Sequence, residues 1–364
     1  MSRQAFWQKK QWGRRLWVRG QRLSRWEFWP MAVVYTPIAF YWVWLAARFG
    51  DWGIWLNCNP VLPASGMAME SKGGILDRFE GPDGAVKVAR YLRVPDDGRD
   101  RLAEILEAGF SFPMVLKPDL GQRGAGVEIV ANEGAARQWL EKCRDEDSVV
   151  QEFADGLEFG VHWSRGPREE VGQILSLCQK HKQSVTGDGK RTLEELVLND
   201  DRAALMVSYY EVAFAKRWQA VIGDGEVVEV APIGTHSRGA VFTDDRSLVT
   251  PELVAVFDEL GARFKGFCFG RYDVKVPSVA DLQAGKNIVV LELNPVMGEP
   301  THVYQPGYAW WQGMRDFFAH FRRAAEIGAA WRAQGVAPPS LHEVWELAMA
   351  HRERDFLEVA KDEN

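Results

Sequence analysis

The sequence predicts a mixed α+β fold, and three observations support this prediction. Short apolar segments separated by glycine-containing turns recur from Phe112 onward, a pattern typical of strands joined as hairpins. Segments with helical spacing and capping residues alternate with them. Hydrophobic residues form 46% and charged residues 26% of the 364 positions, which excludes disorder, collagen and coiled coil as descriptions of the whole chain.

The strands are expected in a definite order along the chain. Phe112–Lys117 is an apolar strand that ends in a lysine, and Val127–Ala131 follows it across a glycine-rich turn as a hairpin. Arg217–Ile222 and Glu226–Val230 are predicted to pair across a Gly-Asp-Gly turn. The other strands are expected at residues 148–153, 157–164, 172–178, 267–276 and 287–293.

The helices are predicted from their caps. Asn132 is expected to cap a helix over Glu133–Cys143, because an Asn side chain can accept a hydrogen bond from a free N–H group of the first turn. Thr192 and Glu195 have the spacing of a capping box that opens another helix. Further helices are expected at residues 251–264, 308–330 and 341–359.

The first 50 residues differ from the rest of the chain in charge. They carry nine Lys or Arg and one acid, Glu27, so this part has a charge of +8 and the remainder −14. Nine of the 16 tryptophans lie between Trp7 and Trp55. Cations interleaved with tryptophan over residues 1–26 predict peripheral contact with an anionic membrane surface. The alternative is a basic tail that packs on its own protein or on a partner, and the overall charge of −6 argues against a dedicated nucleic-acid binder.

Phe28–Ala47 is a run of 20 residues without a formal charge, which is long enough to cross a membrane. Two prolines interrupt it, and its aromatic residues are spread through the run instead of forming two belts. Three interpretations stay open: a fold element beside a membrane-surface arm, an ordinary buried element, and membrane insertion. In the first two, a helix starts at Thr36-Pro37 and ends near Phe49, and Gly53–Cys58 is a buried strand.

Cysteine usage predicts a reducing compartment. The four cysteines are far apart and include no Cys-x-x-Cys pair, which argues against a disulfide framework or a thiolate zinc site. No secretory signal is recognised at the start. A cytoplasmic protein, peripheral on the cytoplasmic face of the membrane, is therefore expected.

Two clusters of residues carry the chemistry. Lys117 stands beside the turn Gly121-Gln-Arg-Gly-Ala-Gly126, in which glycines let backbone N–H groups approach a phosphate while lysine adds charge. The turn joins two strands, so it is neither a P-loop nor a Rossmann fingerprint, and a purely structural hairpin is the alternative. Later, Asp273, Glu292 and Asn294 lie on two successive strands, where same-face oxygen donors would suit Mg²⁺ held with nucleotide phosphates.

These segments resemble the ATP-grasp superfamily of carboxylate–amine ligases over about residues 72–302. PMVLKPDLGQRGAGV resembles the strand and glycine loop that cover the ATP phosphates, VVQEFADGLEFGV the adenine hinge, and RYDVKV and VLELNP the magnesium strands. SVTGDGKRTLEELVLNDDRA and IGTHSRGAVFTD are similar to the cyanophycin synthetase branch. After Asn294 the chain departs from the turn of D-alanine–D-alanine ligases, and the segment before Lys72 is shorter than is usual in the family.

The resemblance implies a role for each matching residue. Lys117 would contact the α/β phosphates, and Lys72 would be the earlier phosphate lysine, for which Lys87 competes. Arg271 would steady the transferred phosphoryl group, and Arg238 would bind a substrate carboxylate. The resemblance also places the glycine loop, the adenine hinge and the ribose ligand in the ATP site: Gly121, Gly124, Gly126, Gln151, Glu152, Phe153, Ala154 and Glu158. It implies that Asp273, Glu292 and Asn294 bind Mg²⁺, with Mn²⁺ as an alternative.

The resemblance further implies an organisation and an activity. Residues 71–330 would form the ATP-grasp domain, with a smaller ATP lobe at about 110–160. They would follow a reduced, basic, Trp-rich segment at 1–70 and precede a C-terminal helix at 331–364. The expected enzyme joins a small-molecule carboxylate to an amine through an acyl phosphate. A kinase-like phosphotransferase and a non-catalytic nucleotide-binding membrane adaptor are the alternatives, and the general base is not assigned.

Overall fold

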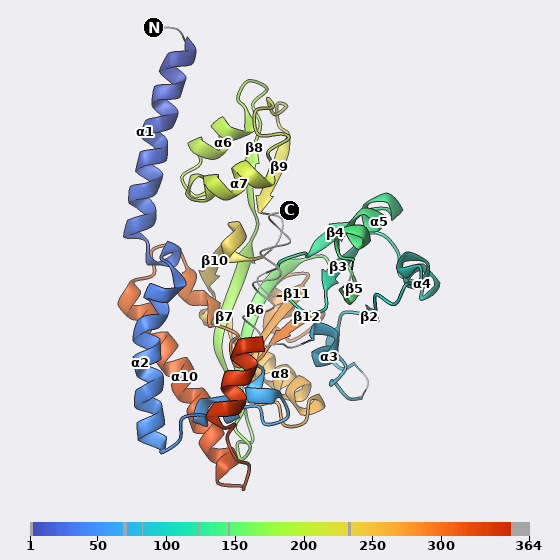
Figure 1. Ribbon diagram of the computed structural model, residues 1–364, viewed down its shortest axis with the longest axis vertical. Coiled ribbons are helices and arrows are strands. Elements are labelled where there is room, and N and C mark those ends of the chain that lie inside the picture. Colours follow the sequence, from blue (N-terminus) through green and yellow to red (C-terminus); the bar gives the residue numbers. More distant parts are fainter. Residues whose placement is uncertain are drawn as a thin grey trace. The chain divides into compact units, whose positions relative to one another are not determined.

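The computed structural model describes residues 3–67, 71–81, 83–121, 124–144, 146–231 and 234–350, and they form the predicted α+β fold (Figure 1). The chain divides into two compact units that interleave along the sequence. Unit 1 consists of Met1–Ile38, Lys180–Thr243 and Val303–Met314, and unit 2 of Ala39–Gln179, Asp244–His302 and Arg315–Asn364. The borders at residues 70 and 330 stay a sequence-based prediction.

The centre of unit 2 is a sheet in which five strands follow in the order β1-β12-β11-β6-β7. Strand β11 is antiparallel to both β12 and β6, and β1 is parallel to β12. The five strands are β1 (Val86–Val88), β6 (Leu157–Ser164), β7 (Gln173–His181), β11 (Phe269–Val276) and β12 (Ile288–Asn294). Helices α3 (Lys72–Leu76), α8 (Pro251–Arg263) and α9 (Val279–Gln283) belong to the same unit.

Side chains alternate across this sheet. Helix α8 buries Phe257 in a core cluster with Phe159 of β6 and Tyr272 of β11, and all three are fully buried. Residues of the same strands that alternate with these, such as Arg271 and Asp273, must point to the opposite face. The core cluster around Phe257 therefore lies on one face of the sheet, and Arg271 and Asp273 lie on the other.

A second, four-stranded sheet in unit 2 has the order β2-β5-β3-β4. Its strands β3 (Met114–Pro118) and β4 (Glu128–Val130) form the predicted hairpin, and Asn132 caps the following helix by accepting a hydrogen bond from the Ala135 N–H group. Figure 1 shows α4 and α5 beside this sheet. The remaining elements are β2 (Tyr91–Val94), β5 (Ser148–Glu152), α4 (Arg101–Glu107) and α5 (Glu133–Lys142).

Unit 1 combines a long basic helix with a small α+β core. Helix α1 (Arg3–Ser24) buries Val18 in a cluster with Val197 and Tyr210. The predicted capping box of Thr192 and Glu195 is present at the start of α6. The other elements are α6 (Leu193–Asn199), α7 (Val207–Ala213), β8 (Gln183–Thr186), β9 (Val227–Ala231) and β10 (Val241–Asp244).

Three cations of the basic arm bind to unit 1 itself. Arg14 donates to the Leu198 carbonyl at 2.7 Å and pairs with Asp201, and Arg15 pairs with Glu194 at 2.8 Å and with Glu211. Arg22 donates to the Leu205 carbonyl at 2.7 Å. The alternative that the arm packs on its own protein therefore holds for this part of α1.

Two further helices pass from one unit into the other. They are α2 (Met31–Phe49) and α10 (Trp310–Arg332). Residues 341–350 are helical as expected, and the predicted continuation to residue 359 lies outside the described residues.

Helix α2 begins earlier than predicted, although it ends where expected. The Val33 and Val34 N–H groups bond to the Pro30 carbonyl at 2.9 and 3.3 Å, so the helix starts at Met31. Thr36 is not its N-cap, because its hydroxyl donates to the Ala32 carbonyl inside the helix at 2.7 Å. Pro37 lies inside the helix and does not mark its start.

The prediction of a strand at Gly53–Cys58 is wrong. Ile54–Asn57 forms a short 3₁₀ helix, and all four of its residues are buried. The Asn57 amide donates to the Gly328 and Val336 carbonyls, which ties this turn to α10 and the segment after it. A short buried apolar run has no periodicity that distinguishes a strand from a helical turn.

The predicted hairpin of Arg217–Ile222 with Glu226–Val230 is also wrong. Strand β9 pairs with β8 instead. The backbone of residues 218–222 bonds to residues 189–194, for example through the Leu193 N–H group and the Ala220 carbonyl at 3.0 Å. Long-range pairing with the start of α6 thus replaces the local hairpin.

Two buried histidines predict acid sensitivity of the fold. Burial lowers the pKa of His162, and it lowers the pKa of His320 to about 3. Both rings therefore stay neutral in the folded chain, whereas the unfolded chain takes up protons near the ordinary pKa of about 6.5. Between about pH 7.5 and pH 5.5 the free energy of unfolding should fall by roughly 1 kcal/mol for each ring.

Urea unfolding at these two pH values measures the effect. The variant His320→Asn should lose less stability on acidification than the wild type, because one of the two rings is gone. An equal loss in both proteins would contradict the assignment.

Candidate active site

Four polar residues come together on the face of the large sheet that is opposite the apolar core. Arg271 and Asp273 lie on β11, and Glu292 and Asn294 lie on β12. In the register of these strands Asp273 is opposite Glu292, and Arg271 is opposite Asn294. Residues two apart on one strand share a face, and directly opposed residues on neighbouring strands also share a face. The four side chains therefore form one polar patch.

Hydrogen bonds fix the arrangement within this patch. The Arg271 guanidinium donates to Asp273 from Nε at 2.9 Å and reaches the Glu299 carbonyl from Nη1 at 3.1 Å. The Asn294 amide donates to Asp273 Oδ2 at 3.2 Å. Burial opposes the charge on Arg271, but the carboxylates of Asp273 and Glu299 outweigh it and raise the pKa of the guanidinium. Arg271 is therefore a permanently charged cation inside the patch.

The neighbouring strand β6 leaves space for this patch. Gly160 is opposite Asp273, and a Cβ atom at Gly160 would lie 3.1 Å from Thr301 Oγ1 and 3.2 Å from Arg271 Cδ. A side chain at this position would therefore displace the arginine or the threonine. Further along the same face, Glu158 pairs with Lys275 at 3.5 Å. Glu158 thus lies at the edge of the patch, and its role as a ribose ligand stays a prediction.

Lys117 joins the small sheet to this patch. Its ammonium group is buried and donates to Gln151 Oε1 at 3.0 Å and to the Leu291 carbonyl of β12 at 3.3 Å. The Gln151 amide also donates to the Leu291 carbonyl, at 3.0 Å. Burial lowers the pKa of Lys117, and the charge of Lys72 adds to this effect, while Glu292 and other nearby carboxylates oppose it.

Lys72 reaches the glycine loop from α3. Its ammonium group donates to the Pro118 carbonyl at 3.0 Å and to the Gly121 carbonyl at 2.9 Å. Gly121, Gly124 and Gly126 all have positive φ angles, and a Cβ atom at Gly126 would lie 2.6 Å from the Pro118 ring. Between them, Gln122 and Arg123 lie outside the described residues.

Lys87 is the competing candidate for the second phosphate lysine. It is exposed on β1, where it is opposite Val289 of β12. Of these two lysines, Lys72 contacts the described part of the glycine loop through the Gly121 carbonyl. Which of the two holds a phosphate stays a prediction.

Asp119 is a site residue that the sequence analysis missed. It is buried, and its carboxylate accepts hydrogen bonds from the Ser71 hydroxyl at 2.6 Å and the Gly73 N–H group at 2.8 Å. Its carbonyl accepts from the Lys72 N–H group at 2.9 Å. Asp119 therefore fixes the start of α3 and with it the position of Lys72. Its place two residues after Lys117 was the available signal.

The predicted adenine hinge follows strand β5. Gln151 points inward to Lys117, whereas Glu152 at the end of the strand is exposed. Phe153 and Ala154 are half-buried in the segment that leads to β6. Their backbone groups belong to no strand, so this segment can offer hydrogen bonds to a base.

Arg238, the expected ligand of a substrate carboxylate, belongs to the other unit of the chain. It lies in a short 3₁₀ helix, His236–Arg238, which belongs to unit 1, whereas the patch and both lysines belong to unit 2. Its expected role toward a substrate carboxylate stays a prediction.

The segment after Asn294 is also anchored, and the sequence analysis assigned no such role to it. His302 Nδ1 lies 2.7 Å from the Ser176 hydroxyl, and Nε2 lies 2.9 Å from Asp316 Oδ2. Both His302 and Ser176 are buried. This anchor, together with the bond from Arg271 to the Glu299 carbonyl, holds the segment beside the patch.

The donor set suits a magnesium ion that is coordinated by protein oxygens and by phosphate oxygens together. Asp273, Glu292 and Asn294 offer hard oxygen atoms on one face, whereas the described residues contain no cluster of three or more His, Cys, Asp or Glu that could hold a metal alone. Magnesium in nucleotide enzymes is commonly held by one or two carboxylates together with phosphates. Where such phosphates would lie, Lys117 and Lys72 provide positive charge. At its glycines, the loop provides a backbone without side chains that would block a phosphate.

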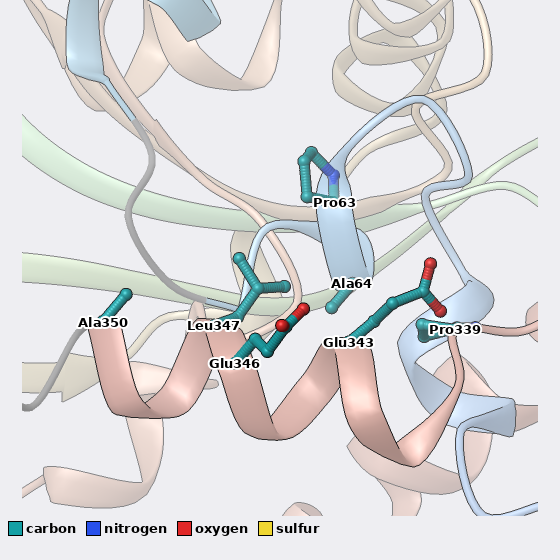
Figure 2. Close-up of a pocket in the computed structure, with 7 residues that line it drawn as sticks. All are labelled: Pro63, Ala64, Pro339, Glu343, Glu346, Leu347 and Ala350. Atoms are coloured by element: carbon teal, nitrogen blue, oxygen red, sulfur yellow. The ribbon is translucent and has the colours of Figure 1, made fainter.

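A separate hollow of about 420 Å³ lies in unit 2, and Figure 2 shows the residues that line it. It lies between the loop at Pro63 and the helical residues 341–350, and no predicted site residue lines it. Its lining consists of Pro63, Ala64, Pro339, Glu343, Glu346, Leu347 and Ala350.

The sequence comparisons agree with the expected resemblance to ATP-grasp carboxylate–amine ligases. Among curated proteins it is similar to cyanophycin synthetase of Geminocystis herdmanii, with 23% identity over 222 residues, which cover 56% of this chain and 25% of the relative. Cyanophycin synthetase of a Synechocystis species shows 23% identity over 224 residues. The chain thus spans about a quarter of the length of these relatives. No protein-family model matches the sequence.

The comparison with solved structures matches part of this chain, at low TM-scores. D-alanine–D-alanine ligase of Bacillus anthracis complexed with ATP shows 12% identity and a TM-score of 0.38, covering 70% of this chain and 67% of the other. The bifunctional glutathione synthetase of Pasteurella multocida shows 15% identity and a TM-score of 0.34, covering 68% and 35%.

Proposed function

We propose that the protein is an ATP-dependent ligase that joins a carboxylate to an amine. One observation carries the proposal. The side chains of Arg271, Asp273, Glu292 and Asn294 share one face of β11 and β12, and the buried Lys117 reaches the backbone of β12. The patch combines fixed cations with acidic oxygen donors, which phosphoryl transfer requires. The sequence similarity to cyanophycin synthetases agrees with this reaction class.

The reaction would proceed in two balanced steps. A carboxylate oxygen of the first substrate attacks the γ-phosphorus of ATP, the bond to the β–γ bridging oxygen breaks, and ADP leaves. The amine nitrogen of the second substrate then attacks the carbonyl carbon, the acyl–oxygen bond breaks, and inorganic phosphate leaves as the amide forms. The amine loses its proton to solvent or to a base that is not assigned.

The side chains of this chain would position and neutralise the reacting groups. Lys117 and Lys72 would hold the phosphates, the glycine loop would cover them, and Arg271 would stabilise charge on the transferred phosphoryl group. The segment Phe153–Ala154 would hold adenine, and Glu158 the ribose. Asp273, Glu292 and Asn294 would hold magnesium, which neutralises phosphate charge when bound.

A substrate screen tests this proposal. Purified protein with ATP and Mg²⁺ is offered pairs of small carboxylates and amines, and ADP release and product mass are measured. A productive pair should release ADP only when both partners are present, and the product should have the mass of the two substrates minus one water. ADP release with a phosphorylated product and no amide would contradict the proposal.

The two candidate phosphate lysines are separated by a matched pair of variants. Lys72→Met should lower the rate of ADP release by about tenfold or more, because one fixed cation beside the phosphates is lost. Lys87→Met removes the same charge at an exposed position and should leave the rate unchanged. An unaffected rate in Lys72→Met would transfer the role to Lys87.

We further propose that the enzyme works in the cytoplasm at the membrane surface. In the described part of the chain, one helix, Met31–Phe49, is long and apolar enough to cross a membrane by length and composition. The cations of α1 were expected to provide the attraction, but Arg14, Arg15 and Arg22 are bound to unit 1. These three cations are therefore engaged within unit 1, and lipid contact by residues 1–26 stays a prediction.

A further inference from the structure

Helix α2 is apolar on both of its faces. The inner face buries Val34, Ile38 and Leu45, which follow the spacing of one helical side. On the outer face Phe40 is 74%, Val43 50% and Trp44 49% exposed. A surface helix of a protein that meets only water normally carries polar residues on its outer side. The outer face of α2, defined here by Val33, Phe40, Val43 and Trp44, therefore needs a different explanation.

The inner face fixes the helix to the body of unit 2. The Trp42 ring stacks on Trp55 with centroids 4.8 Å apart and meets Phe321 edge-on at 5.2 Å. The Tyr41 ring stacks on Phe318 at 4.4 Å. A helix that crosses a bilayer would have to give up these contacts and expose their partners. The packing thus favours a helix that stays on the protein and presents only its outer face.

The charges around the outer face indicate what covers it. No acid occurs between Glu27 and Asp51, and Arg48 is exposed at the end of the helix. The Glu27 carboxylate is buried against Arg202 at 2.6 Å, so it contributes no exposed negative charge near the start. A second copy of this chain would place like charges against each other, whereas an anionic surface would complement them.

We propose that the outer face of α2 lies flat on an anionic lipid bilayer, with Phe40, Val43 and Trp44 between the headgroups and Arg48 near the phosphates. Exposed aromatic and aliphatic side chains beside a cation, here Arg48, are found in helices that lie in the membrane interface. This inference goes beyond the ligase reaction, which does not need a membrane, and it can fail or hold independently of that reaction.

Vesicle flotation tests the inference with the full chain. The vesicles consist of phosphatidylcholine and phosphatidylglycerol in equal parts, with phosphatidylcholine alone as the uncharged comparison. The variant Phe40→Glu/Trp44→Glu places two negative charges on the outer face. The control Val171→Glu/Trp345→Glu adds the same charges at exposed apolar positions that are not part of α2. Circular dichroism and thermal unfolding check the fold of both variants.

The wild type and the control should float with the anionic vesicles. The outer-face variant should lose about tenfold or more in partition coefficient, because one large apolar side chain withdrawn from the interface already corresponds to roughly that factor. Trp44 fluorescence should shift to shorter wavelength on binding, measured as the difference between the wild type and Trp44→Phe.

Four results would overturn the inference. They are equal flotation of the wild type and the outer-face variant, no flotation of the wild type, and binding that only detergent reverses, which would indicate a crossing helix. The fourth is a dimer in light scattering that the outer-face variant abolishes, which would make a second copy the occupant.

Discussion

Asp273→Asn and Glu292→Gln should each lower the rate of ADP release by roughly a thousandfold or more, while the chain remains folded. The two carboxylates face each other across β11 and β12, and they are the only acids among the predicted metal ligands. Each substitution keeps the size of the side chain and removes one negative charge. The loss should therefore appear in catalysis and in Mg²⁺ dependence rather than in the fold.

The choice of substitution is important at Asp273. Its carboxylate pairs with the buried Arg271, and Asp273→Ala would leave that cation without its partner at a cost of about 3–5 kcal/mol in stability. The amide variant retains a hydrogen-bond acceptor for Arg271. Glu80→Gln, at an exposed ion pair with Lys265, is the matched control and should turn over normally. Near-normal Mg²⁺-dependent ADP release in both site variants would contradict the metal assignment.

Lys117→Met should weaken ATP binding by about a hundredfold, measured by titration calorimetry. The side chain is buried and is held by Gln151 and the Leu291 carbonyl, so its ammonium group is fixed where the phosphates would lie. Methionine keeps most of the volume and removes the charge. Lys87→Met is the control, because that lysine is exposed on β1.

The pKa of Lys117 adds a second readout. Because burial lowers this pKa below its ordinary value, the lysine loses its charge at a lower pH than an exposed lysine does. ATP affinity should therefore fall as the pH rises into the alkaline range, and Lys117→Met should lack this part of the fall. Unchanged affinity in the variant at neutral pH would remove Lys117 from the phosphate site.

The sequence predicted those parts of the site in which local pattern and residue chemistry agree. Lys117 ends a strand before a glycine loop, and Asp273 and Glu292 stand in apolar strands whose alternation places them on one face. It failed where distant contacts decide the structure. Gly53–Cys58 has the composition of a strand, but contacts with the segments around Gly328 and Val336 make it a helical turn.

Other features depend on packing that no local pattern records. The sequence-based predictions assign no role to Asp119, and only the folded chain shows that it fixes α3 and Lys72. Pro37 suggested a helix start, but the Pro30 carbonyl accepts the first bonds of α2. Arg14, Arg15 and Arg22 of α1 find partners in unit 1, which the charge pattern alone did not indicate, and lipid contact by residues 1–26 stays a prediction.

Trapping of the activated carboxylate tests the central claim most directly. The protein is incubated with ATP, Mg²⁺, a pool of small carboxylates and hydroxylamine, which intercepts an acyl phosphate as a stable hydroxamate. Formation of a hydroxamate together with ADP, and its loss in Glu292→Gln, is the result expected of a carboxylate–amine ligase. ATP-dependent phosphorylation of a hydroxyl group without any hydroxamate, or nucleotide binding without ADP release from any pool, would contradict that function.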